Sequence, residues 1–293
     1  MGAGGRRGLI AAGLAAACFA APVAASAASA ASQYLYERAL MGAADGRCHL
    51  FTPAIGRALS AARAQARNAV LRGGASSADV EATERRAMAK AASVDCHAPG
   101  LKLAADRLRV AFADYAKLQT LSFPGVRAGW KAERPYPAYH GAPRWGLAQG
   151  VLGQGGWMVF GITGGQVTLL DGRPDSAPAP IARIVFRNPA ILSEPYVDLR
   201  RNDPADQVAP AAVSQTFIAR GRTSAARSLL PAGARTGLAY QFSPDVMAAL
   251  AQLDPREMAA LQLVYPGSKG DRVVTGWVEV GDLAAARAFL VVR

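Results

Sequence analysis

Apolar residues recur at three- and four-residue steps along the first part of the chain, a spacing that predicts amphipathic helices. The strongest stripe joins Leu101, Leu108, Phe112 and Tyr115. Weaker stripes predict three earlier helices, over 33–46, 53–72 and 77–94. Four helices joined by short turns favour an up-down-up-down arrangement.

Residues typical of helix ends predict where the helices begin and end. Thr52-Pro53 predicts a helix start, because Thr accepts a backbone hydrogen bond there and Pro is tolerated in the first turn. Ser76 or Ser77 predicts another start, and Gly73-Gly74 ends the helix before it. Proline at position 99 predicts the start of the fourth helix.

After about residue 144 the spacing of apolar residues shortens to every second residue in several runs, and strands are expected. The runs 157–163 and 166–170 flank Gly164-Gly165, a typical hairpin pattern. Further strands are predicted over 181–186, 213–219, 237–242, 261–265 and 272–280, and helices over 224–230, 243–253 and 283–290, the last capped by Asp282. The predicted fold class is α+β: an N-terminal disulfide-closed helical bundle followed by a mixed, mainly antiparallel strand-rich domain.

Two Cys-His pairs, Cys48-His49 and Cys96-His97, lie in the first and third turns between predicted helices. In an up-down-up-down bundle these turns share one end, so a Cys48–Cys96 disulfide is expected. It would be worth about 4 kcal/mol in the chain-entropy estimate. The alternative is a zinc site formed by both pairs, with His49 and His97 as ligands, which needs reduced thiolates.

The first 30 residues have the pattern of a secretory signal peptide. Arg6 and Arg7 precede an apolar stretch that is short for a membrane span, and two Ala-x-Ala sequences follow. A lipoprotein signal ending at Cys18 is the competing interpretation. We therefore expect a periplasmic or secreted protein without a transmembrane helix in its mature chain. The predicted division is signal peptide 1–30, four-helix bundle-like domain 31–120, linker 121–150 and strand-rich domain 151–293.

The chain carries 33 Lys+Arg against 21 Asp+Glu, a formal charge of +12. The cations are spread evenly and are mostly arginines, and alanine is abundant. In these respects the chain resembles exported proteins of Gram-negative bacteria with GC-rich genomes. Genomic bias explains the charge in part, and attraction to an anionic envelope polymer or envelope protein is the functional explanation. A nucleic-acid partner is not expected, because no basic stripe is present.

One stretch combines aromatic and basic side chains among prolines and glycines. Aromatic faces stack on sugar rings or apolar groups, and Arg forks bind phosphate or carboxylate. The alternative is a linker whose aromatic residues pack on the next domain. The candidate ligand-binding residues are Trp130, Arg134, Tyr136, Tyr139, His140, Arg144 and Trp145.

Motifs for catalysis and cofactors are missing from the sequence. Neither a G-x-S-x-G elbow nor an S-x-x-K set is present, and no cofactor is expected. We predict a non-catalytic envelope protein that binds a polymer or a protein partner. A periplasmic hydrolase that uses His140 with a carboxylate from the strand-rich half is one alternative. Metal binding by His49 and His97 is another.

Overall fold

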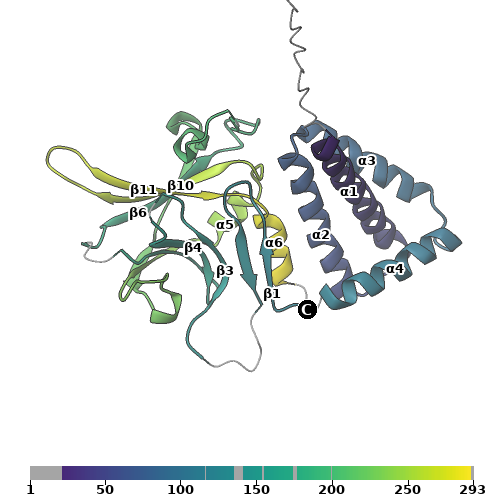
Figure 1. The fold of residues 1–293 in the computed structure, drawn as a ribbon, viewed down its shortest axis with the longest axis horizontal. Helices are drawn as coiled ribbons and strands as arrows, with labels where there is room; N and C mark the ends of the chain where they lie inside the picture. Colours follow the sequence, from purple (N-terminus) through teal and green to yellow (C-terminus); the bar gives the residue numbers. More distant parts are fainter. Residues whose placement is uncertain are drawn as a thin grey trace, which may run out of the picture.

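A computed structural model describes the chain from residue 22 to residue 291, apart from 116, 135–140, 154, 174–176 and 199. Side chains are described from residue 30 onward. The described chain forms a helical half and a strand-rich half that lie side by side (Figure 1). This arrangement confirms the predicted α+β class with helices first and antiparallel strands after them. The expected signal peptide falls largely outside the described residues.

The helical half contains four helices. Their ends lie close to the predicted ones except at the start of the first, which begins at Pro22 instead of residue 33. They are α1 (Pro22–Cys48), α2 (Pro53–Arg72), α3 (Ser77–Ser93) and α4 (Pro99–Tyr115). Local chemistry fixes the starts of α2 and α3. Thr52 accepts the N–H of Ile55, and Ser76 forms a reciprocal capping box with Asp79.

Helix α1 packs against both α2 and α3, whereas α4 contacts α2. Figure 1 shows α4 diverging from α3 after the turn that joins them. That turn holds Cys96, which forms a disulfide with Cys48, with the two Cα atoms 5.5 Å apart. The predicted covalent link between the first and third turns is thus confirmed.

The strand-rich half contains two antiparallel sheets. One has seven strands in the order β1-β2-β3-β4-β5-β9-β8, and the other has four in the order β11-β10-β6-β7. The strands are β1 (Thr120–Phe123), β2 (Trp130–Glu133), β3 (Trp145–Gly150), β4 (Met158–Thr163), β5 (Gln166–Asp171), β6 (Ile181–Arg187), β7 (Ser214–Ile218), β8 (Gly221–Ser224), β9 (Leu238–Phe242), β10 (Met258–Tyr265) and β11 (Arg272–Glu279).

The two sheets are joined at two corners. Strands β7 and β8 follow each other directly, and the first pairs with β6 while the second pairs with β9. At the other corner, Leu152 forms a bridge with Trp277 of β11. The sheets therefore enclose one core, which contains large side chains such as Phe160, Phe186 and Tyr240.

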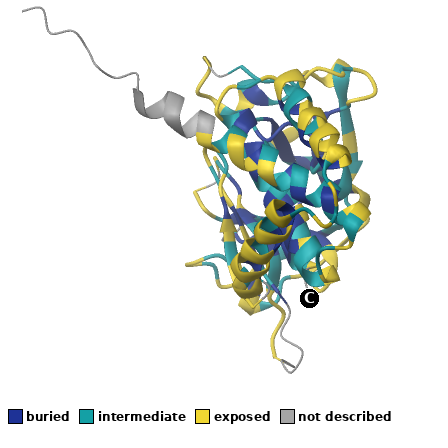
Figure 2. Cartoon of the chain, turned by 90° about the vertical axis from the view of Figure 1, so that its right-hand side faces the viewer, coloured by how far each residue is buried: buried dark blue, intermediate teal, exposed yellow. Residues whose placement is uncertain are grey.

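Two short helices complete this half: α5 (Asp245–Leu250) and α6 (Leu283–Leu290). Three 3-10 turns lie in the connections: η1 (Pro204–Gln207), η2 (Ala211–Val213) and η3 (Arg227–Leu229). Helix α6 packs on α2 and on the strands β1 and β2, so it lies between the two halves. In Figure 2, which faces the helical half, exposed residues cover the outer helix surfaces and buried residues lie behind them.

The structure differs from the sequence prediction in the range 121–150, which contains the three strands β1, β2 and β3 instead of an irregular linker. Antiparallel pairing of β1 with β2, of β2 with β3 and of β3 with β4 holds these strands, and α6, which is distant in sequence, packs on β1 and β2. A second difference is the start of β10, which was predicted at residue 261 and lies at Met258. No described helix has the length and apolar character needed to cross a membrane.

Candidate functional site

A pocket of about 670 Å³ opens where β2, β3 and the β4–β5 hairpin meet the end of α6. Its apolar wall includes Trp145, Ile162 and Leu290, and its charged residues are Glu133, Arg134 and Arg144. The volume is within the range of small-ligand sites, and a mainly apolar lining with a few charged groups is typical of them. We call it the β2–β3 pocket.

Arg134 forms the back of this pocket and is held firmly. Its Nε donates to the carbonyl of Phe289 at 2.8 Å, and Nη1 donates to the carbonyl of Leu118 at 2.8 Å. The guanidinium also lies 3.7 Å from the centre of the Phe289 ring. Because the side chain is only 5% exposed, its main role is to tie β2 to α6 and to the end of the helical half.

Arg144 and Trp145 form the rim. Arg144 makes an ion pair with Glu133 at 2.8 Å, and its own side chain is 56% exposed. The indole N–H of Trp145 donates to the carbonyl of Leu229 at 3.1 Å, which fixes the orientation of the ring. A fixed aromatic face beside a paired but accessible guanidinium can bind a ligand with a flat apolar side and an anionic or hydroxyl group.

The structure places the predicted ligand-binding residues in different parts of the molecule. Arg134, Arg144 and Trp145 line one pocket. Trp130 is 1% exposed, and its indole N–H donates to Val280 at 2.9 Å, so this side chain belongs to the core. Tyr136, Tyr139 and His140 lie outside the described residues, and the proposed role of His140 in hydrolysis remains a prediction.

Several pocket residues were not anticipated from the sequence. Ile162 and the Gly164-Gly165 turn were assigned only to a hairpin, and Leu290 lies more than a hundred residues away at the end of α6. The pairing of β3 with β4 brings Ile162 next to Leu147 and hence to the pocket. Glu133 offered a usable signal, because it directly precedes Arg134 in the aromatic-basic stretch.

A second hollow of about 700 Å³ lies between the start of α3 and the segment 194–200, and Arg256 lines it too. Two of its charged side chains have local partners, since Arg256 forms an ion pair with Asp254 at 2.8 Å and Asp198 pairs with Arg201 at 3.3 Å. Its lining contains no aromatic side chain, unlike that of the β2–β3 pocket, although the two volumes are similar.

The Cys-His corners give no metal centre in the described chain. The two sulfurs are bonded to each other, and His97 has a 96% exposed side chain next to Asp95. No group of three or more His, Cys, Asp or Glu side chains that could hold a metal ion occurs among the described residues. Two exposed histidines without thiolates provide few of the ligands that zinc needs.

Two buried carboxylates of the strand-rich half, Glu279 and Asp282, have structural partners. The carboxylate of Glu279 is 1% exposed and accepts the backbone N–H groups of Arg127 at 2.7 Å and Ala128 at 2.9 Å. Asp282, predicted as a helix cap, makes no capping bond. Its buried carboxylate pairs instead with Arg72 of α2, and burial raises its pKa above the ordinary value although Arg72 opposes the change.

Comparison of the chain with protein-family models, with curated proteins and with solved structures finds no match. The function must therefore be inferred from the geometry of this chain.

Proposed function

We propose that the protein is an exported, non-catalytic binding protein whose β2–β3 pocket takes a sugar-containing segment of an anionic envelope polymer. The observation that carries this proposal is the convergence of Arg144, Trp145 and Glu133 on one pocket of about 670 Å³. The internal disulfide supports export, because such bonds persist in oxidising compartments.

The chemistry of the pocket fits a sugar better than a purely apolar ligand. The oriented ring of Trp145 supplies a flat surface for a sugar face. Arg144 and Glu133 together supply donors and acceptors for hydroxyl and carboxylate groups. The net charge of +12 attracts an anionic polymer over a longer range, and this attraction weakens as salt is added.

Co-sedimentation with insoluble peptidoglycan, and retention on immobilised lipopolysaccharide, test the proposal at two salt concentrations. We expect Trp145→Ala to weaken binding about tenfold, because loss of an aromatic stacking contact costs about 1.4 kcal/mol. Trp157→Ala is the matched control, since Trp157 is a partly buried tryptophan that does not line this pocket.

Arg144→Glu tests the charged rim. We expect it to reduce both the affinity and its salt dependence, whereas Arg235→Glu, which changes the charge equally at an exposed position away from the pocket, should change affinity only slightly. Equal losses of affinity in both variants would mean that binding depends only on the general charge of the protein. Binding by neither polymer, or retention unaffected by Trp145→Ala, would contradict the proposal.

A further inference from the structure

The outer face of the four-stranded sheet is defined by strand register. Paired residues of neighbouring strands point to the same side. Val273, Val264 and Ile181 form one row across β11, β10 and β6. The next row contains Thr275, Gln262, Arg183 and Ile218. The alternate residues, such as Leu261, Leu263 and Ile184, belong to the core, so these two rows face outward.

Three aliphatic side chains on this face remain open. The exposed fractions are 62% for Ile218, 40% for Val273 and 37% for Ile181. Single exposed aliphatic residues are common on soluble proteins. Ile218 and Ile181 lie on the neighbouring strands β7 and β6, and Val264 of β10, which is 3% exposed, lies between Ile181 and Val273. They therefore form a contiguous apolar patch.

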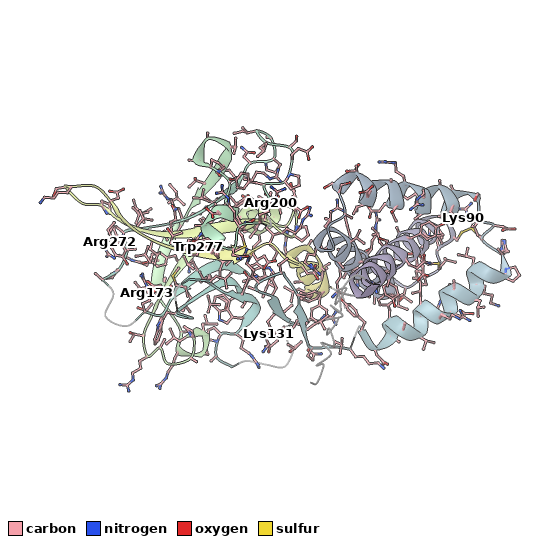
Figure 3. All side chains as sticks on the ribbon, turned by 45° about the horizontal axis from the view of Figure 1, so that its top comes forward. Lys90, Lys131, Arg173, Arg200, Arg272 and Trp277 are labelled. Atoms are coloured by element: carbon pink, nitrogen blue, oxygen red, sulfur yellow. A yellow bond between two sulfur atoms is a disulfide. The ribbon has the colours of Figure 1, made fainter. Side chains whose placement is uncertain are left out.

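Cations surround the patch. Arg183 lies within it, and its Nε donates to Oε1 of Gln262 at 2.7 Å, which holds the guanidinium at the face. Arg220 follows β7 and Lys269 lies in the turn of the β10–β11 hairpin, and both are exposed. This hairpin projects away from the helical half in Figure 1. Arg272 is also on the projecting part (Figure 3), but it pairs with Tyr265 in the alternate row and its guanidinium lies 3.8 Å from the centre of that ring, so it belongs to the opposite face.

Acidic side chains are scarce here. Strands β6, β7, β10 and β11 carry a single acid, Glu279, which is 1% exposed and bound to backbone N–H groups. Asp271 lies at the hairpin tip between Gly270 and Arg272. The face therefore has exposed aliphatic side chains at its centre and cations around them. This combination is complementary to a surface that is anionic outside and apolar beneath.

We infer that this face lies against the surface of a bilayer containing anionic phospholipids. Ile218, Ile181 and Val273 enter the headgroup region, while Arg183, Arg220 and Lys269 contact lipid phosphates. This contact is separate from the proposed polymer binding and uses none of the residues of the β2–β3 pocket.

The apolar side chains of this face favour lipid over a protein partner. Protein interfaces usually have aromatic anchors at their centre. Trp277 is on the same face, but it is only partly exposed, and Gly153 lies so close that a Cβ there would be 2.4 Å from the ring. Figure 3 shows Trp277 well inside the outline of the strand-rich half. The open apolar side chains are thus Ile and Val, which suit shallow insertion between lipid headgroups.

Vesicle co-sedimentation of the full chain tests the inference, with vesicles of phosphatidylcholine alone and of phosphatidylcholine mixed with phosphatidylglycerol. We expect binding to the mixed vesicles only. Lys269→Glu should lower the partition coefficient about tenfold, because each charge near an anionic bilayer has a substantial effect. Lys102→Glu makes the same charge change on the exposed surface of α4 and should have little effect.

The apolar patch has its own matched pair of variants. Ile218→Asp should abolish most vesicle binding, while Ile191→Asp, at an aliphatic residue of similar exposure (59%), should not. Trp145→Ala should bind vesicles like the wild type, which separates this test from that of the pocket. Equal losses in test and control variants would overturn the inference. So would wild-type protein that binds neither vesicle, or that instead binds an acidic protein in a manner sensitive to Ile218→Asp.

Discussion

Alanine dominates the buried positions of the helical half, whereas the strand-rich half buries large aromatic rings. Where α1, α2 and α4 meet, Ala44, Ala58 and Ala62 pack with a few larger residues such as Leu59 and Phe112. The core between the sheets contains Trp130, Phe123, Phe160, Phe186, Tyr240, Phe242 and Phe289. A buried alanine removes little apolar area from water, while an aromatic side chain buries roughly 150–250 Å².

The covalent bond lies in the half with the smaller side chains. Both cysteines after residue 18 are in the helical half, and residues 120–293 contain none. A disulfide stabilises mainly by restricting the unfolded chain, so it adds stability that does not depend on buried area. The comparison teaches that the two halves use different sources of free energy, one from chain restriction and the other from ring burial.

The largest expected effect tests the aromatic core. Trp130→Ala should reduce the free energy of unfolding by about 5 kcal/mol, because it leaves a cavity and removes the hydrogen bond to Val280. Equilibrium denaturation followed by circular dichroism measures it. Trp157→Ala, at a partly exposed ring, should cost clearly less. A Trp130→Ala variant as stable as wild type would mean that ring burial does not stabilise this half.

The disulfide is the next test. Cys48→Ser combined with Cys96→Ser should cost about 4 kcal/mol, because the two cysteines are 48 positions apart and close a long loop. Hydrogen exchange should show the loss in α1 and α3, with the β4–β5 hairpin unchanged. Wild-type protein reduced with a thiol should behave like the double variant. Equal loss of protection in both halves would show that they unfold as one unit. It would contradict the claim that the disulfide stabilises the helical half in particular.

Local signals explain why the helical half was predicted well. The starts of α2 and α3 follow from Thr52 and Ser76, whose side chains cap residues three positions away. The disulfide followed from turn order alone. Strands β1 and β2 were missed because they are only four residues long, lie among prolines and glycines, and pack on α6, which is distant in sequence. Their environment, rather than their own propensity, makes them strands.

In the candidate site, too, residues with a local sequence signal were predicted and residues placed by tertiary packing were not. Arg144 and Trp145 were found because aromatic and basic residues stand out in sequence, and both line the pocket. Trp130 was grouped with them, although β2 alternates between buried and open positions, with Trp130 and Ala132 inward and Lys131 outward. That period of two was the missed signal. Leu290 could not be found, because only tertiary packing brings α6 to β2.

A smaller effect is expected where the two halves meet. Arg72→Met keeps the apolar stem but leaves the fully buried carboxylate of Asp282 without its cation, since Asp282 has 0% side-chain exposure. We expect a loss of about 3 kcal/mol at neutral pH, measured by chemical denaturation. Arg85→Met removes an exposed pair with Glu81 on α3 and should cost about 0.5 kcal/mol or less. Similar costs for both variants would show that burial of the pair is unimportant.

The smallest effect isolates the protonation of Asp282. Burial raises its pKa above the ordinary 3.8, so the folded state binds a proton more tightly than the unfolded state. Stability from this group is therefore greatest at acid pH and falls as pH rises from about 3.8 through the folded pKa. Asp282→Asn lacks this titration while keeping a hydrogen-bonding side chain of the same shape.

Measured against wild type at several pH values, Asp282→Asn should therefore gain relative stability as the pH rises through that window. Asp106→Asn, at a half-exposed carboxylate, serves as the control for general charge effects. The opposite trend, with wild type gaining over Asp282→Asn as pH rises, would mean that attraction to Arg72 outweighs the cost of burial. The Arg72–Asp282 pair would then stabilise the protein by charge attraction, unlike the two cores, which depend on chain restriction and ring burial.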